Sequence, residues 1–167
     1  GEAGVEQLLR VGDRRRERRH HGAERLHPEP AVGPVVRVGP VLDRVDASLD
    51  VLHAVAHDVT RRGAYVVHTG TAEVPARLRV LGGAEAIAAG SSGAVRLHLD
   101  RQLPVLPGDR YVLRESGRAE TIGGGEILDI APVLPVRRAS PGRTIERVVR
   151  EHGWLTIDDV EALTGEQ

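Results

Sequence analysis

The sequence contains no cysteine, methionine, phenylalanine, lysine or asparagine among its 167 residues. The absence of cysteine excludes disulfides, cysteine-ligated zinc, iron–sulfur clusters and thiol nucleophiles. Only 2% of the residues are aromatic, so the core must be built from Val, Leu, Ile and Ala. All 23 basic residues are Arg, which is typical of a GC-rich coding sequence. Because an initiator Met is missing, we expect the chain to be a fragment of a longer protein.

Charge and hydropathy narrow the class of protein further. The formal net charge is −1, which argues against binding of nucleic acid or membrane through overall charge. No apolar run approaches the roughly 18 residues that span a bilayer, and the first residues lack the apolar core of a signal peptide. We therefore expect a soluble, cytoplasmic protein without a membrane partner.

The composition changes along the chain and indicates four segments. Residues 1–45 are rich in Arg, His, Pro and Gly, and we expect them to be irregular or disordered. Residues 46–136 alternate between polar and apolar side chains, as strands do. Residues 137–142 have the composition of a linker, and residues 143–167 show helical periodicity.

The alternation in residues 46–136 predicts short β-strands. In Val95–Leu99 the Val and Leu side chains alternate with Arg and His, so the apolar ones share one face. Similar segments occur at 64–68, 76–81, 110–114 and 126–130, and the expected first strand is 50–55. Turn signals such as Pro107–Asp109 separate the segments. The pattern predicts a mainly β fold, a small antiparallel β-barrel whose closure leaves no strand edge open.

Residues 143–167 have the spacing of two short α-helices. The predicted apolar faces consist of Ile145, Val148 and Val149 in the first helix and Ile157, Val160 and Leu163 in the second. Thr156 is the expected N-cap of the second helix, and Gly153 and Gly165 are the expected ends of the two helices. Two short helices joined by a tight turn are typical of the start of a helix-turn-helix or winged-helix unit.

The glycine triplet Gly123, Gly124 and Gly125 is open to three interpretations. A phosphate-cradling loop is disfavoured, because the pattern G-x-x-x-x-G-K-[ST] is absent from the chain. A β-bulge or a close backbone approach between strands would also require glycine. A surface free of side chains could, thirdly, let an RNA backbone come close.

Other polar residues are weak candidates for catalysis. His68, Thr69 and Thr71 lie near Glu73 at the end of an expected strand, but no nucleophile elbow is present. The hydroxyl groups are better explained as hydrogen-bonding partners of the backbone in a turn. His20–His21 lacks the further ligands that a metal site needs. Without a nucleophile–base pair or a set of metal ligands, we do not expect this chain to be an enzyme.

The strand arginines have two interpretations. For most of them, such as Arg77, Arg79 and Arg96, we favour the solvated face of a sheet. Arg114 and Arg118 lie beside the glycine triplet and are candidates for phosphate contacts, because Arg binds phosphate in a bidentate manner and stays charged.

Two blocks of sequence resemble the selenocysteine-specific translation elongation factors. The first is Val67–Arg77, which reads VHTGTAEVPAR. The second runs from Gly108–Arg114 (GDRYVLR) to Thr121–Asp129 (TIGGGEILD), in the order found in the family. The resemblance covers about residues 46–136, and its pattern of arginines and glycines is also similar to the third domain of elongation factor Tu. The helical piece is similar to the first winged-helix module that follows the barrels of the bacterial selenocysteine factors.

The resemblance implies a parent protein that is a GTPase and delivers selenocysteyl-tRNA to the ribosome at UGA codons. GTP and Mg²⁺ would be held by a G domain outside this chain, so no cofactor is expected here. The barrel would pack on the G domain and a second barrel and help to hold the tRNA. Winged-helix modules outside the chain would bind a hairpin in the messenger RNA.

The resemblance also implies candidate RNA-binding residues. They are His68, Thr69, Thr71, Arg114, Arg118, Thr121, Gly123, Gly124 and Gly125. An alternative is a β-barrel that binds a partner domain in another translation-factor-like GTPase and does not touch RNA. The net charge of −2 in residues 46–136 counts mildly against strong RNA binding by the barrel alone.

Residues 1–45 depart from the family, which should have strands of the second barrel there. One hypothesis is translation in a shifted frame, because a GC-rich gene read out of frame yields Arg, Gly, Pro, Ala and His. The alternative is a genuine insertion or a disordered arm. The nucleotide sequence tests the first hypothesis, which fails if no single-base shift restores a strand pattern.

Overall fold

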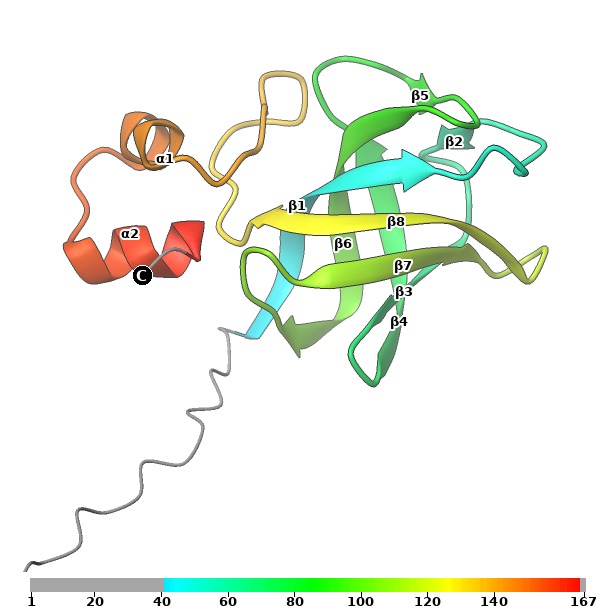
Figure 1. The fold of residues 1–167 in the computed structure, drawn as a ribbon, viewed down its shortest axis with the longest axis horizontal. Helices are drawn as coiled ribbons and strands as arrows, with labels where there is room; N and C mark the ends of the chain where they lie inside the picture. The colour runs from blue at the N-terminus through cyan, green and yellow to red at the C-terminus, as the bar shows by residue number, and fades with distance from the viewer. Residues whose placement is uncertain (1–40, 166–167) are drawn as a thin grey trace, which may run out of the picture. The chain divides into compact units, whose positions relative to one another are not determined.

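The computed structural model describes residues 41–165. Residues 1–40 of the expected irregular segment, with His20–His21, thus lie outside the described residues. The frame hypothesis for residues 1–45 stays a prediction. Within the described part the fold is mainly β, with a closed six-stranded barrel followed by two short helices, as the sequence predicts (Figure 1).

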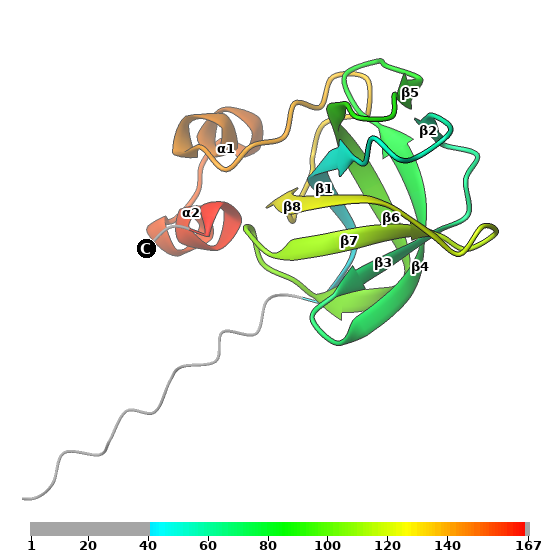
Figure 2. The same cartoon turned by 45° about the vertical axis from the view of Figure 1, so that its right-hand side comes forward.

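The barrel strands are antiparallel and close in the order β1-β6-β4-β3-β7-β8 (Figures 1 and 2). Their bounds are β1 Val41–Val51, β3 Tyr65–Thr69, β4 Ala72–Val80, β6 Ser92–Pro104, β7 Arg110–Glu115 and β8 Glu120–Asp129. A separate two-stranded sheet pairs β2 (Val59–Thr60) with β5 (Ala86–Ile87). Every barrel strand therefore has two neighbours, and no edge of the barrel is left unpaired.

The first strand begins earlier than the sequence indicates. The predicted strand 50–55 is wrong, because β1 spans Val41–Val51 and the chain then turns, with the Val55 N–H donating to the Leu52 carbonyl. Residues 41–45 belong to the barrel and not to the irregular segment. The inward positions Val45, Ala47 and Leu49 are buried, but a bulge before Arg44 and the buried polar Asp46 obscure the alternation in the sequence.

The core is aliphatic, as the scarcity of aromatic residues requires. Its largest fully buried hydrophobic side chains are Leu49, Leu78, Leu97, Leu113, Ile122, Val45, Val59, Val74, Val95 and Val148. Burial of each such side chain contributes about 1.5–3 kcal/mol. Both tyrosines are buried, and each hydroxyl donates a hydrogen bond to a backbone carbonyl. Tyr111 donates to the Ser48 carbonyl at 2.6 Å, and Tyr65 donates to the Thr60 carbonyl at 2.8 Å.

The two helices are α1 (Ile145–His152) and α2 (Ile157–Thr164). The caps predicted at Thr156, Gly153 and Gly165 are present, and Thr156 forms a reciprocal capping box with Asp159. The predicted apolar faces are only partly buried. Val148 is buried, whereas Ile145, Val149 and Ile157 are exposed in this part of the chain. Neither described helix has the length and apolar character needed to cross a bilayer.

Candidate nucleic-acid interface

His68, Thr69 and Thr71 lie on the hairpin that joins β3 to β4. The Thr69 hydroxyl donates to the carbonyl oxygen of Arg110 at 3.0 Å, which ties the hairpin to the start of β7. His68 Nδ1 is 4.0 Å from a carboxylate oxygen of Glu73. The hairpin borders an open hollow of about 410 Å³, lined by Thr69, Gly70, Thr71, Ala72, Leu103, Pro104, Asp109 and Arg110. Two hydroxyls, an Arg and an Asp therefore border one open recess.

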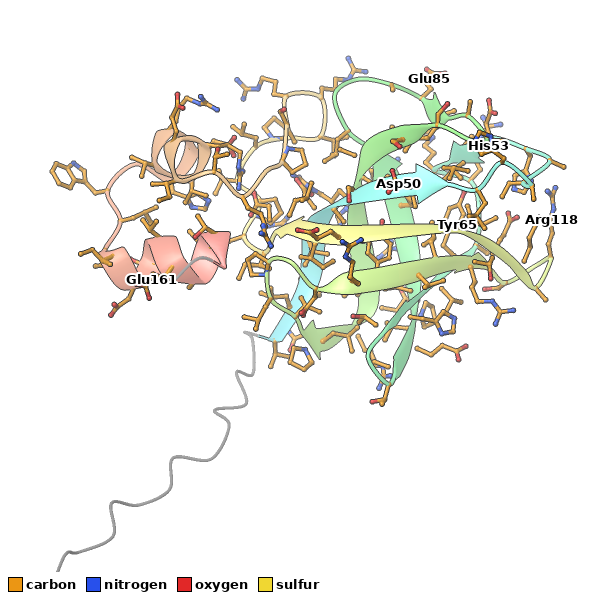
Figure 3. All side chains as sticks on the ribbon, viewed as in Figure 1. Asp50, His53, Tyr65, Glu85, Arg118 and Glu161 are labelled. Atoms are coloured by element: carbon orange, nitrogen blue, oxygen red, sulfur yellow. The ribbon has the colours of Figure 1, made fainter. Side chains whose placement is uncertain are left out.

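Arg114, Arg118 and Thr121 lie at the hairpin that joins β7 to β8, and Figure 3 shows Arg118 at its end. Arg114 donates to the Ala119 carbonyl at 3.0 Å, across the turn. Arg118 contacts His57 and lies 3.8 Å from Glu115, whose carboxylate is also 3.0 Å from His57. Part of the charge of Arg118 is thus neutralised within the protein.

The structure does not bring these two groups together. In the pairing of β3 with β7, Tyr65 faces Glu115 and His68 faces Val112. The β3–β4 hairpin therefore lies at one end of this strand pair, and the β7–β8 hairpin lies at the other (Figures 1 and 2). The candidate residues form two separate sites on the barrel.

Each glycine of the triplet sits against backbone of a neighbouring strand. A Cβ at Gly123 would lie 2.1 Å from the Asp50 carbonyl oxygen, and one at Gly125 would lie 2.0 Å from that of Ser48. A Cβ at Gly124 would lie 2.5 Å from the carbonyl oxygen of Tyr111. The triplet lets β8 lie close to β1 and β7, which agrees with the close-approach interpretation. Contact of these glycines with RNA stays a prediction.

A third group of polar residues lies on the outer face of β1, β4 and β6. Strand pairing places Arg77 of β4 and Arg44 of β1 on either side of His98 of β6, and it pairs Arg79 with Arg96. Burial lowers the pKa of His98, and the neighbouring guanidinium groups of Arg44, Arg77, Arg96 and Arg79 lower it further. The alternation in the sequence indicated that these residues face outward, but not that they meet.

Arg96 differs from its neighbours because it is buried and paired, so the prediction that it lies on a solvated face is wrong. Its Nε and Nη2 donate to the two carboxylate oxygens of Asp46 at 2.6 and 2.8 Å, and Nη2 also donates to the Leu134 carbonyl. Burial raises the pKa of Asp46, while the hydrogen bond from Arg96 opposes this shift. The same hydrogen bond raises the pKa of Arg96. This pair is structural, because neither group is free to meet a ligand.

The described residues contain no group of three or more His, Cys, Asp or Glu side chains arranged to hold a metal ion. The candidate sites between residues 41 and 165 are instead made of hydroxyls, backbone and guanidinium groups. Such groups bind anions, and phosphates of a nucleic acid in particular.

A closed, six-stranded antiparallel barrel with candidate anion-binding residues on its surface defines a small β-barrel domain. Comparison with protein families gives its particular identity. Residues 44–133 match the family described as the β-barrel domain of the selenocysteine-specific elongation factor, and the chain belongs to this family. The match begins in β1 and continues past the end of β8, so the resemblance inferred from the sequence is confirmed. A search of curated proteins found no match.

Proposed function

We propose that this barrel binds selenocysteyl-tRNA within an elongation factor that delivers this tRNA to the ribosome at UGA codons. The family match over residues 44–133, which includes all or most of every barrel strand, is the observation that carries the proposal. The barrel would hold the RNA through its backbone, since the candidate groups are hydroxyls and arginines. Binding of this kind is dominated by phosphates and weakens steeply with salt.

The parent protein would supply the remaining steps. We propose that GTP and Mg²⁺ bind in a G domain outside this chain. The barrel would pack against that domain and a second barrel. Helices α1 and α2 would begin a winged-helix module, of which further copies bind a messenger RNA hairpin. The short, individually capped helices with a four-residue connection support this assignment. The factor would act in the cytoplasm.

Within the proposed site, Thr71 offers a hydroxyl beside the open hollow, and Arg114 offers an exposed guanidinium at the other end of the barrel. The Thr69 hydroxyl would have to exchange its bond to the Arg110 carbonyl for one to a phosphate. Arg118 would have to exchange its contacts with Glu115 and His57 for contacts with a phosphate. We therefore expect Arg114 to contribute more to binding than Arg118, because Arg114 gives up no carboxylate partner among the described residues.

A filter-binding titration with the full chain tests the proposal. We expect selenocysteyl-tRNA to bind more tightly than a mixture of elongator aminoacyl-tRNAs, with an affinity that falls as salt rises. Circular dichroism of the same sample must show a folded β protein. A folded chain that binds neither RNA, or both equally at every salt concentration, would contradict the proposed function.

A second candidate function is the docking of a partner protein domain without RNA contact. The observation that favours it is apolar side chains exposed at three separate points of the barrel, at Val41, Leu52 and Val112. Under this alternative, the chain would form a stable complex with a separately produced G domain. In the filter-binding titration, the chain would not retain selenocysteyl-tRNA on the filter. The two candidates therefore predict opposite outcomes for the same preparation.

A further inference from the structure

We propose that the outer face of β1, β4 and β6 is a surface that binds the backbone of an RNA double helix. This surface, here called the arginine face, consists of Arg44, Arg61, Arg62, Arg77, Arg79 and His98. The inference rests on the proposed function, and it names a further part of the barrel that meets RNA. It places this contact away from the hairpin residues that the sequence indicated.

Strand pairing concentrates positive charge on the arginine face. Arg44, His98 and Arg77 form one row across three neighbouring strands, and Arg79 lies two residues beyond Arg77 on β4. Residues two apart on a strand lie about 7 Å from each other on the same face. Arg61 and Arg62 approach Arg77 and Arg79 from the segment between β2 and β3, and together they line a hollow of about 270 Å³. The hollow is open to solvent and edged by four guanidinium groups.

None of the five arginines on this face has a carboxylate within ion-pair distance in residues 41–165. The nearby carboxylate of Asp46 is already occupied by the buried Arg96. Asp100, exposed two residues beyond His98 on β6, makes no ion pair with the face. Arg79 faces the cationic Arg96 across β4 and β6, and like charges that face each other across a sheet destabilise it. An anionic ligand would relieve this repulsion, which favours a phosphate-binding role over a merely solvated surface.

The chemistry of the face favours a double helix over a single strand. Proteins that bind single-stranded RNA stack its bases on exposed aromatic side chains. The barrel has only Tyr65 and Tyr111, and both are buried, with their hydroxyls bound to backbone. The arginine face therefore offers guanidinium groups but no Phe, Tyr or Trp, which suits the phosphates and 2′-hydroxyls of an RNA helix. Arg is suited to this role because its planar group binds phosphate in a bidentate manner.

Three double variants of the full chain, each of which loses two positive charges, test the inference. The first, Arg77→Gln with Arg79→Gln, alters the arginine face. The second, Arg114→Gln with Arg118→Gln, alters the β7–β8 hairpin. The third, Arg137→Gln with Arg138→Gln, is the control, since both residues are exposed and follow the barrel. Because all three have the same net charge, a difference between them reports the position of the charge.

The probes are selenocysteyl-tRNA, a short blunt-ended RNA duplex and the single strand of the same sequence, each titrated over a series of salt concentrations. We expect the first variant to weaken binding of tRNA and duplex and to lower the slope of log K against log salt by about two, one for each lost phosphate contact. The control variant should keep the wild-type slope. Thermal unfolding must show that the variants remain folded, which we expect because both changed side chains are exposed.

The outcomes separate the inference from the proposed function. If the wild-type chain binds tRNA but the Arg77/Arg79 variant behaves like the control, the arginine face is not the RNA surface, and the proposed function stands. If the Arg114/Arg118 variant alone lowers the slope, the hairpin is the RNA surface and the inference is wrong. A wild-type chain that prefers the single strand also overturns it. A folded wild-type chain that binds none of the probes contradicts the proposed function itself.

Discussion

Arg147 of α1 donates through Nη1 to a carboxylate oxygen of Asp129, the last residue of β8, at 2.8 Å. The same nitrogen lies 2.8 Å from Glu151, and Nε donates to the Gly142 carbonyl at 2.7 Å. Both members of the Arg147–Asp129 pair are buried. Next to them lies the Asp46–Arg96 pair, because Asp46 faces Asp129 across β1 and β8. A buried network of opposite charges thus attaches the helical segment to the barrel.

Replacement of Arg147 by Met should destabilise the chain strongly. The change leaves Asp129 and Glu151 without their shared cation in a buried site, which costs about 3–5 kcal/mol when one partner of such a pair is lost. Urea unfolding monitored by circular dichroism measures the loss. Arg150→Met is the matched control, because the side chain of Arg150 is exposed and its contact with Glu146 is 3.9 Å long. Equal stability of the two variants would show that the network does not stabilise the fold.

Addition of one methyl group to the glycine triplet should also be costly. In Gly125→Ala the new Cβ would lie 2.0 Å from the Ser48 carbonyl oxygen, so the strands must separate, at about 1–3 kcal/mol. Gly117→Ala is the control, since a Cβ there meets nothing within 4 Å. Thermal unfolding of both proteins checks the prediction. Unchanged stability of Gly125→Ala would indicate that β8 lies further from β1 than described.

Tyr111 should resist ionisation until the barrel unfolds. Burial raises the pKa of its phenol well above the usual value of 10.0, and the charge of Asp50 raises it further. The folded state therefore retains a proton that the unfolded state loses, so stability is unaffected below pH 10 and falls as pH rises above it. The absorbance of tyrosinate and circular dichroism should change together in an alkaline titration. If Tyr65 and Tyr111 both ionised near pH 10 while the protein stayed folded, the described burial would be contradicted.

His98 should have a pKa below the usual 6.5, because it is partly buried and surrounded by four arginines. As pH falls below 6.5, the unfolded state takes up this proton before the folded state does, and stability falls. A pH titration of the imidazole resonances by NMR measures the pKa. The variant Arg77→Gln should raise it, since one repelling charge is removed. A pKa that Arg77→Gln leaves unchanged would show that Arg77 does not act on His98.

Loss of the Tyr111 hydroxyl offers a smaller effect for comparison. In Tyr111→Phe the Ser48 carbonyl loses its donor, which is 2.6 Å away in a buried site, and we expect a cost of about 1–2 kcal/mol. Chemical denaturation measures it. Tyr65→Phe is the second variant. The Tyr65 hydroxyl donates to the Thr60 carbonyl at 2.8 Å and accepts from the Thr60 N–H at 3.2 Å. It is less deeply buried than the Tyr111 hydroxyl, so water can replace the lost bonds. The Tyr65 change should therefore cost less, and the reverse order would contradict the relative burial of the two hydroxyls.

Several elements were predictable because their signals are local. The alternation in Val95–Leu99 places Leu97 in the core and His98 outside, as observed. The caps at Thr156 and Gly165 depend only on backbone geometry within one turn of the helix. The family resemblance was also carried by local blocks of residues. The start of β1 was missed, because a bulge interrupts the alternation before Val45.

The sequence by itself determined the aliphatic composition of the core, the strand-forming segments after residue 60, the two helices and the family. Only the tertiary structure decided which residues meet. Asp46 and Arg96 are 50 residues apart, and they pair because β1 lies beside β6. The same closure of the barrel places Arg44 and Arg77 on either side of His98. It also places His68 and Arg114 at opposite ends of a strand pair, and it packs the glycine triplet closely against the neighbouring strands. Alternation along a strand sets the face on which a side chain lies, whereas its neighbours depend on the register between strands that are distant in the chain.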